Sequence, residues 1–457
     1  MKLHYWALFG TLAAACLPAS AQKTPKIPIE QFKLKNGLRV ILSEDHSAPV
    51  VGLALAYDVG SRSEVKGRTG FAHLFEHMMF QGSAHVGKFE HPRIIEAAGG
   101  VMNGFTRTES TTYIETVPSE KLPLVLWLES DRMRSLAVTA ENLKNQQEVV
   151  KEEKRLNYDN VPYANARRVK LPELAYSNYA NQHSTIGSMQ DLDAATLTDV
   201  QSFFKTYYAP NNATLVLVGD LNPKEARKLV TQYFGDIPNQ PAPPTPDLKE
   251  PKQTAEKREV YNDPLARLPA LMLAWHGPSL GDPDTYASDI LMDLVFGGET
   301  SRGYQELVKK RQLAVAVQGG LDSERGPSLF TLFAVYRPNI TAETMEKAIY
   351  EQIESIQKNP PSAEELQRIK TQIKAAKIRN AGPFAALGST LSRAIEIADY
   401  AVFQNNPNLI NTELDKYMAV TPDQIQAVAR KYFTPENRSV VEVKPGTGAT
   451  PKSGASK

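Results

Sequence analysis

Cysteine is almost absent from this chain of 457 residues, because the single example, Cys16, lies in the N-terminal segment. One cysteine forms no internal disulfide, and a metal site beyond that segment cannot use thiolate ligands. A charge bias is also absent, since 52 Lys and Arg balance 51 Asp and Glu to a formal net charge of +1. This balance does not favour a nucleic-acid partner. Beyond the N-terminal segment, no apolar run is long enough to span a membrane.

The first 21 residues have the pattern of a secretory signal. Met1-Lys2 precedes an apolar run from Trp6 to Leu17, and Ala19-Ser20-Ala21 resembles a cleavage site. We expect cleavage after Ala21 and a mature chain in the periplasm or outside the cell. Lipid anchoring at Cys16 is the alternative, although the three alanines before it match that signal poorly.

Histidine is scarce as well, with 8 residues in the chain, yet two of them fall in one motif, HLFEH at 73–77. Positions i and i+4 lie one above the other on a helix, so His73 and His77 can offer their ring nitrogens to one metal ion. Glu76 lies beside them, and the pattern is the inverted zinc-protease motif H-x-x-E-H. The alternative is an amphipathic core helix with two hydrogen-bonded histidines.

A hydrolytic zinc site usually takes a third protein ligand. The segment from Thr139 to Asn157 predicts a long helix, because it has a capping threonine, no Pro or Gly, and helical periodicity. Glu153 falls within its apolar arc, where a carboxylate is costly unless it is paired or binds a metal. We therefore predict Glu153 as the third ligand, with a buried salt bridge as the alternative. The arc comprises Leu143, Gln146, Val149, Val150 and Leu156.

With these features the chain resembles the pitrilysin and insulin-degrading enzyme family of inverted-zincin metallopeptidases, which includes the mitochondrial processing peptidase. The resemblance extends to GGVMNGFTRTESTTY at 99–113, HSTIGSMQDL at 183–192 and FFKTYYAPNNATLVLVGDL at 203–221. It implies that His73, His77 and Glu153 hold one zinc ion per chain.

The resemblance also implies that Glu76 is the general base of a peptide hydrolysis. A glutamate that commonly stands seven residues before the third ligand in this family is Gln146 here. Because that residue supports the ligands in the family, we expect zinc geometry or affinity to be tuned differently in this chain.

Substrate binding is expected along the segment from Gly99 to Tyr113, where a Gly-Gly turn precedes a β-favouring run. In the family, the matching residues lie on an edge strand that adds the substrate to a sheet. Asn103 and Gly104 are carried over as substrate contacts, which would recognise backbone more than side chains. An ordinary hairpin with Asn103 as a turn residue is the alternative.

The Pro-rich and charged segment 236–257 predicts a linker between two domains. We expect a signal peptide at 1–21, a zinc-bearing catalytic domain at 22–240, a linker at 241–257, a second homologous domain at 258–444 and a disordered tail at 445–457. Periodicity alone indicates mixed α and β structure. The resemblance implies an α+β fold of two related domains, each a mostly antiparallel sheet packed with helices, which together form one half of a clamshell.

The second domain lacks an arginine and a tyrosine that bind substrate and stabilise the transition state in the family. Val308 and Val315 stand at these positions, and valine cannot donate a hydrogen bond to an oxyanion. Arg302 and Arg311 are nearby in other registers.

We therefore expect this chain to form a heterodimer with a homologous subunit that supplies the missing arginine and tyrosine. We expect this heterodimer to hydrolyse short or unfolded peptides. A homodimer that works without the pair is the alternative. A different class of function, a non-catalytic core subunit of a larger complex, also fits the fold, but such subunits tend to lose the metal motif that this chain retains.

Overall fold

The structure is a computed structural model that describes residues 26–379 and 388–446. The predicted signal peptide at 1–21 and residues 447–457 of the predicted tail lie outside the described residues. Within the described ranges, no helix combines the length and the apolar character needed to cross a membrane.

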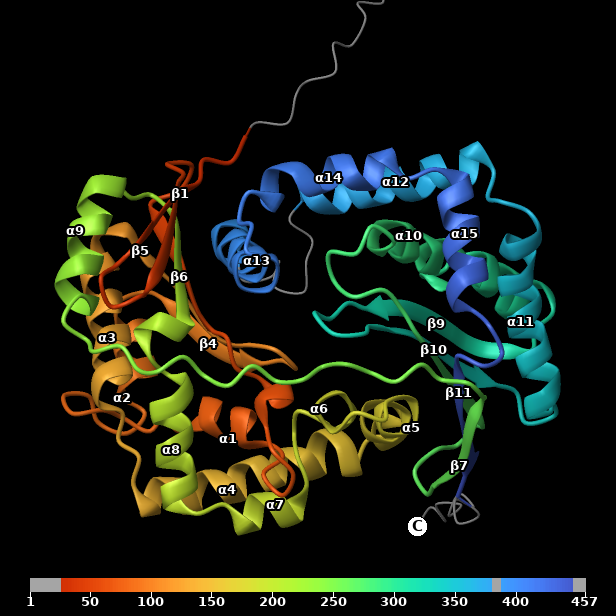
Figure 1. Cartoon of the computed structure of the whole chain (residues 1–457), viewed down its shortest axis with the longest axis horizontal. Helices are drawn as coiled ribbons and strands as arrows, with labels where there is room; N and C mark the ends of the chain where they lie inside the picture. The colour runs from red at the N-terminus through yellow and green to blue at the C-terminus, as the bar shows by residue number, and fades with distance from the viewer. Residues whose placement is uncertain (1–25, 380–387, 447–457) are drawn as a thin grey trace, which may run out of the picture.

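Two β-sheets of the same topology form the centres of the two halves of the molecule (Figure 1). In spatial order, the first sheet contains β1 (Glu30–Lys33), β2 (Arg39–Glu44), β6 (Ala213–Gly219), β3 (Val50–Tyr57), β5 (Thr111–Pro118) and β4 (Val101–Thr106). The second contains β7 (Lys257–Asp263), β11 (Arg438–Pro445), β8 (Ala270–His276), β10 (Leu329–Tyr336) and β9 (Ala314–Asp322). Apart from the extra edge strand β1, both halves therefore arrange their strands as first, last, second, fourth and third along the chain.

Neighbouring strands are antiparallel except for two pairs, β2 with β6 and β7 with β11. The predicted α+β fold of two related domains with mostly antiparallel sheets is confirmed. The last strand, β11, includes Pro445, which pairs with Asp263, so the second sheet extends one residue into the predicted tail.

Long helices cover the outer face of each sheet (Figure 1). On the first sheet these are α1 (Phe71–Met78), α3 (Leu122–Ser135), α8 (Leu197–Tyr207) and α9 (Pro223–Phe234), with α4 (Ala140–Lys154) packed on α1. On the second they are α10 (Thr285–Phe296), α11 (Ala342–Lys358) and α15 (Pro422–Tyr432), with α12 (Ala363–Ile378) packed on α10. The connecting helices are α2 (Glu90–Ala97), α6 (Tyr179–Gln182), α7 (Met189–Ala194) and α14 (Leu409–Ala419).

The inner face of the first sheet is covered by a helix from the second half of the chain. This helix, α13 (Ser389–Gln404), lies between the two sheets in Figure 1 and buries Leu391 and Ala398 against Ile41 and Ala54. Because a sheet with two apolar faces must bury both, α13 completes the core of the first half.

The inner face of the second sheet is covered in return by a segment of the first half. A π-helical turn, η4 (Ala166–Lys170), continues into α5 (Leu171–Ala175), and Leu171 packs with Met272 and Val441. We call this reciprocal packing of α13 and α5 the helix exchange. The predicted boundaries near residues 240 and 258 separate the two sheets, but the packing crosses these boundaries in both directions.

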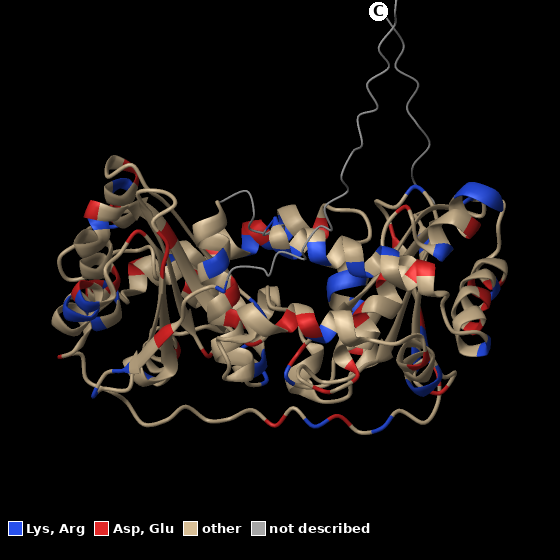
Figure 2. Ribbon diagram, turned by 90° about the horizontal axis from the view of Figure 1, so that it is seen from above, with Lys and Arg blue, Asp and Glu red and all other residues tan. Residues whose placement is uncertain are grey.

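The linker between the halves has no helix or strand from the end of α9 to the start of β7. It runs as an extended chain along one side of the molecule (Figure 2). The Glu250 carboxylate accepts hydrogen bonds from the backbone N–H groups of Ser177 and Asn178, which ties the linker to the segment after α5.

The helix exchange predicts a large cost for added volume at Gly52 on β3. A Cβ atom at Gly52 would lie 3.0 Å from the backbone N and Cα of Leu391 in α13, and backbone atoms cannot yield as a flexible side chain would. We expect Gly52→Ala to lower the free energy of unfolding by about 1–3 kcal/mol, measured by urea denaturation. The matched control is Gly320→Ala, where no atom lies within 4 Å of the added Cβ. Equal effects of the two variants would contradict the tight packing of α13.

Candidate metal centre

The H-x-x-E-H motif lies on α1, a helix that begins without a cap from its own N-terminal residue. Gly70 precedes it with a φ of +83°, a conformation that favours glycine. The Glu64 carboxylate replaces the missing cap, because it accepts the backbone N–H groups of Gly70 at 2.9 Å and Ala72 at 2.8 Å. A negative charge at a helix N-terminus is stabilising, so Glu64 fixes the start of the motif helix.

His183, from the resembling segment HSTIGSMQDL at 183–192, supports Glu64 and lies outside the group of candidate ligands. Its Nε2 lies 3.1 Å from the Glu64 carboxylate and 2.7 Å from the carbonyl oxygen of Ser61. Burial lowers the pKa of His183, but the hydrogen bond and the charge of Glu64 raise it by more. The pKa of His183 therefore lies above its ordinary value. The pair therefore anchors the start of α1.

The structure brings His73, His77 and Glu153 together. The Glu153 Oε2 atom lies 3.5 Å from His73 Nε2 and 3.3 Å from His77 Nε2. Two ligand atoms that each lie about 2.1 Å from a tetrahedral zinc ion are about 3.4 Å apart. The donor set and the two distances from Glu153 therefore fit a zinc ion.

Helix α4 carries Glu153 to this position, although its predicted apolar arc is only partly correct. The helix starts at the predicted cap, where the Thr139 side chain accepts the Asn142 N–H. Leu143, Gln146 and Val150 are buried, whereas Val149 and Leu156 are 42% and 58% exposed. Only the narrower stripe spaced by three and four residues faces α1, and Val149 lies outside it. Leu156 lies beyond the end of α4 at Lys154, on a π-helical turn, η3 (Arg155–Asp159).

Gln146 and burial set the state of the two imidazoles. The Gln146 Oε1 atom lies 3.3 Å from His77 Nδ1, where it can accept a hydrogen bond and leave Nε2 toward Glu153. Burial, with a smaller effect of His77, lowers the pKa of His73 to about 4. His73 is therefore neutral at pH 7, the form in which imidazole binds a metal.

His77 and Glu153 shift each other in opposite directions. Burial lowers the pKa of His77, but its contact with Glu153 and the charge of Glu76 raise it above the ordinary value. The hydrogen bond from His77 lowers the pKa of Glu153 against the effect of burial. Glu153 is therefore an anion at neutral pH.

Glu76 is buried between α1 and the edge strand β4. The Thr106 hydroxyl donates to Glu76 Oε2 at 2.6 Å. Gly104, on the same face of β4, leaves the space that Glu76 fills, since a Cβ there would lie 3.3 Å from Glu76 Cγ. Burial raises the pKa of Glu76, and the Thr106 hydrogen bond offsets only part of that rise. A base with a raised pKa takes up protons more readily near neutral pH.

Thr106 and Glu64 were missed by reasoning from the sequence. A signal was present for Glu64, because a helix that starts after glycine lacks a side-chain cap and needs an acceptor from elsewhere. No local pattern pointed to Thr106, which reaches Glu76 from a different element.

The predicted substrate segment contains strand β4, which among the described strands pairs only with β5 and is therefore an edge of the first sheet. Asn103 is exposed on β4, and its side chain accepts the N–H of Gly104. A cavity of about 890 Å³ lies between the halves where β4 ends. Its lining includes Arg107, Thr108, Tyr158, Arg168, Leu321 and Asp322.

A second group of potential ligands, His91, Glu115 and Glu129, is buried in the first half. The guanidinium of Arg132 donates to both carboxylate oxygens of Glu129. This cluster already contains a cation, so His73, His77 and Glu153 form the better candidate metal centre among the described residues.

Neither Arg302 nor Arg311 takes the place of the missing arginine and tyrosine. Val308 packs on the second core, and Val315 is half-exposed on β9. Arg302 pairs with Glu365 at 2.7 Å, and Arg311 pairs with Glu351 at 2.6 Å. Both nearby arginines are thus engaged within the second half.

Comparison with known proteins identifies the family of this chain. Residues 39–188 match the family described as Insulinase (Peptidase family M16), and residues 194–373 match the Peptidase M16 inactive domain. The zinc protease PqqE of Helicobacter pylori is 30% identical over 419 residues, which cover 91% of this chain and 93% of the relative. This chain belongs to peptidase family M16.

Solved structures of two proteases have the same fold. A protease from Helicobacter pylori has a TM-score of 0.86 and 31% identity, with 92% of this chain and 100% of that chain covered. The periplasmic protease PqqL of Escherichia coli has a TM-score of 0.72 and 18% identity, which shows the fold alone, and the match covers 92% of this chain but 48% of PqqL. The family resemblance inferred from the motifs is confirmed, and all four residues of the candidate M16 metal centre lie in the first matched region.

The geometry predicts different titration of the two imidazoles in metal-free protein. We expect His73 to stay neutral until the pH approaches 4, and His77 to protonate above pH 6.5. The pKa of His73 is lower in the folded chain than in the unfolded chain, so as the pH falls the unfolded chain binds a proton on His73 first. His73 therefore destabilises the metal-free fold as the pH falls from 6.5 towards 4.

NMR titration of the imidazole signals after chelation measures both values, with His73→Asn to assign one signal. Protonation of His73 above pH 6 would contradict the burial of this ring.

Proposed function

We propose that this chain is a zinc-dependent endopeptidase that hydrolyses short or unfolded peptides and acts as the zinc-bearing subunit of a heterodimer. The observation that carries the proposal is the convergence of two imidazoles and a carboxylate at zinc-like spacing beside Glu76. The naming of relatives as zinc proteases supports the same chemistry.

In this proposal His73, His77 and Glu153 hold one zinc ion, and Gln146 orients His77. Zinc bound there would supply a Lewis acid that polarises a peptide carbonyl and makes water more acidic. Two neutral imidazoles and one carboxylate form a donor set of the kind found in hydrolytic zinc sites.

Glu76 is the proposed general base. Its raised pKa and its burial suit the transfer of a proton from the attacking water to the leaving amine. The Thr106 hydroxyl holds one carboxylate oxygen, so the other remains available for this transfer.

The peptide would bind along β4, whose edge is unpaired within the described sheet. An extended backbone can pair with such an edge, with Asn103 and Gly104 as contacts. The adjoining cavity of about 890 Å³ has the size of a ligand site for a short peptide segment.

The proposal also includes export and a partner. The N-terminal signal pattern supports a periplasmic or secreted protein. A homologous subunit would supply the arginine and tyrosine that Val308 and Val315 replace, and the coverage of only 48% of PqqL is consistent with a catalytic unit built from two such chains. A homodimer remains the alternative assembly.

The first test is turnover of a pool of unstructured peptides by the mature chain, with and without Glu76→Gln. We expect the variant to keep one zinc per chain and to lose activity by about 10²–10⁴-fold, because proton transfer is removed while the ligands stay. The control Glu152→Gln changes an exposed carboxylate one residue from Glu153 and should leave activity unchanged. A chain that binds no zinc would instead support the non-catalytic subunit.

The second test concerns the partner. We expect the zinc-loaded chain alone to be slow and to gain about 10²–10³-fold in turnover when a homologous subunit with the Arg-Tyr pair is added, the effect of an oxyanion donor. Peptide kinetics combined with mass measurement of the complex distinguish the outcomes. Full activity of the isolated chain would contradict the need for the pair.

A further inference from the structure

The turn between β4 and β5 is held by the second half of the molecule. This turn, residues 107–110, contacts the loop between β9 and β10. The Thr108 hydroxyl donates to both carboxylate oxygens of Glu324, at 2.8 and 2.7 Å. The backbone N–H of Arg325 donates to both oxygens of Glu109 at 3.0 Å.

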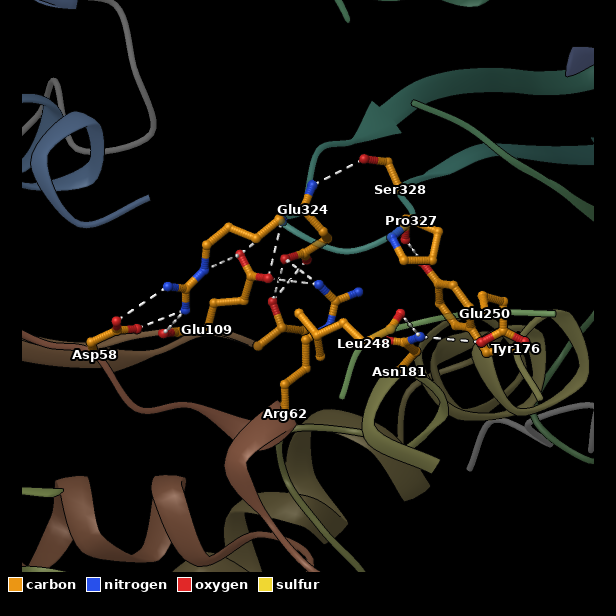
Figure 3. A network of polar contacts seen from close by, with 12 residues as sticks. Asp58, Arg62, Glu109, Tyr176, Asn181, Leu248, Glu250, Glu324, Pro327 and Ser328 are labelled. Carbon is orange, nitrogen blue, oxygen red and sulfur yellow. Dashed lines mark hydrogen bonds and ion pairs between the residues drawn. The ribbon is translucent and has the colours of Figure 1, made fainter. Parts of the chain in front are cut away.

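A buried arginine joins these contacts into one network (Figure 3). Arg62 donates to Glu109 at 2.7 Å and lies 3.6 Å from Glu324. Its backbone N–H donates to the carbonyl oxygen of Thr108 at 2.9 Å. The Arg62 and Glu109 side chains are 2% and 4% exposed, so their charges are poorly screened by solvent and depend on each other.

Two further ion pairs link the halves, one at the turn and one beside it. Arg107 donates to both carboxylate oxygens of Asp399 in α13, at 2.8 Å each. Arg325 reaches past the turn to Asp58, at 2.6 Å. Both the β9–β10 loop and helix α13 therefore contact the same four-residue turn.

The held turn directly follows Thr106, the residue that contacts Glu76. Thr106, which donates to Glu76, lies two residues before Thr108. Among the described strands β4 pairs with β5 alone, and the turn that joins these two strands helps to set its position against α1. A shift of the turn would move Thr106 relative to Glu76, and it would move the substrate-binding edge at the same time.

We propose that Glu324 is a positioning residue, through which the second half holds Thr106 and the edge of β4 in the geometry that Glu76 requires. This inference rests on the proposed role of Glu76. It assigns a task to the second half, whose sequence matches a domain described as inactive: that domain sets the geometry of the first half's site.

The first experiment measures amide hydrogen exchange of residues 101–114 in the full chain, which does not depend on peptidase activity. We expect Glu324→Ala to speed exchange in this segment by about tenfold or more, because the turn opens locally. Glu324→Gln keeps an oxygen acceptor for Thr108 and should retain most of the protection.

The matched control is Tyr176→Phe, which removes a hydrogen bond of 2.6 Å from the tyrosine hydroxyl to the carbonyl oxygen of Pro327 in the same loop. It should leave exchange at 101–114 unchanged. Unaltered exchange in Glu324→Ala, or equal acceleration in the control, would overturn the proposal.

The second experiment is a double-mutant cycle of Thr106→Val and Glu324→Ala in the zinc-loaded enzyme with its partner. We expect each variant to lower kcat by about 10–100-fold at full zinc content, and the double variant to be no slower than Thr106→Val alone. Multiplying effects would mean that Glu324 does not act through Thr106. If the wild-type protein hydrolyses no peptide, the proposed function fails, and the exchange result alone decides whether Glu324 holds the turn.

Discussion

The need to cover both faces of two apolar sheets is the constraint on which the rest of this structure depends. Strand β6, for example, is buried along its whole length, so neither of its faces can meet water. The chain satisfies the constraint by the helix exchange, with α13 on the first sheet and α5 on the second. Each half therefore completes the core of the other, and their relative position is set by packing and not by the linker. This fixed relation allows the loop of Glu324 to reach the turn beside Glu76.

The two halves have the same topology but different chemistry. Helix α1 follows β3 as α10 follows β8, yet only α1 carries the two histidines and Glu76. Helix α10 instead contributes apolar side chains such as Leu291, Leu294 and Phe296 to its core. Likewise β4 and β9 are corresponding edges, but only β4 lies against a candidate metal centre. The same topology thus carries a candidate site in one half and an apolar core at the corresponding helix of the other.

Much of the candidate site could be predicted from the sequence, because its parts have local signatures. The i, i+4 histidines and the carboxylate within an apolar stripe are read from one helix at a time, and these residues do meet in space. The exposure of Val149 and Leu156 could not be foreseen, since it depends on how narrowly α4 faces α1 and on the π-helical turn after Lys154. Thr106 and Glu324 act across long distances in sequence, where periodicity carries no information. The same applies to α13, because an amphipathic pattern shows that a helix covers a sheet without showing which sheet.

The helix exchange also bears on how such a protein can change over evolutionary time. Two independent domains can accept substitutions separately. Here a mutation in α13 also changes the packing against the sheet of the other half. The halves are therefore inherited as one selective unit, and compensating changes are expected on opposite sides of the linker. A half without a metal motif can thus remain as constrained in sequence as the half that carries one.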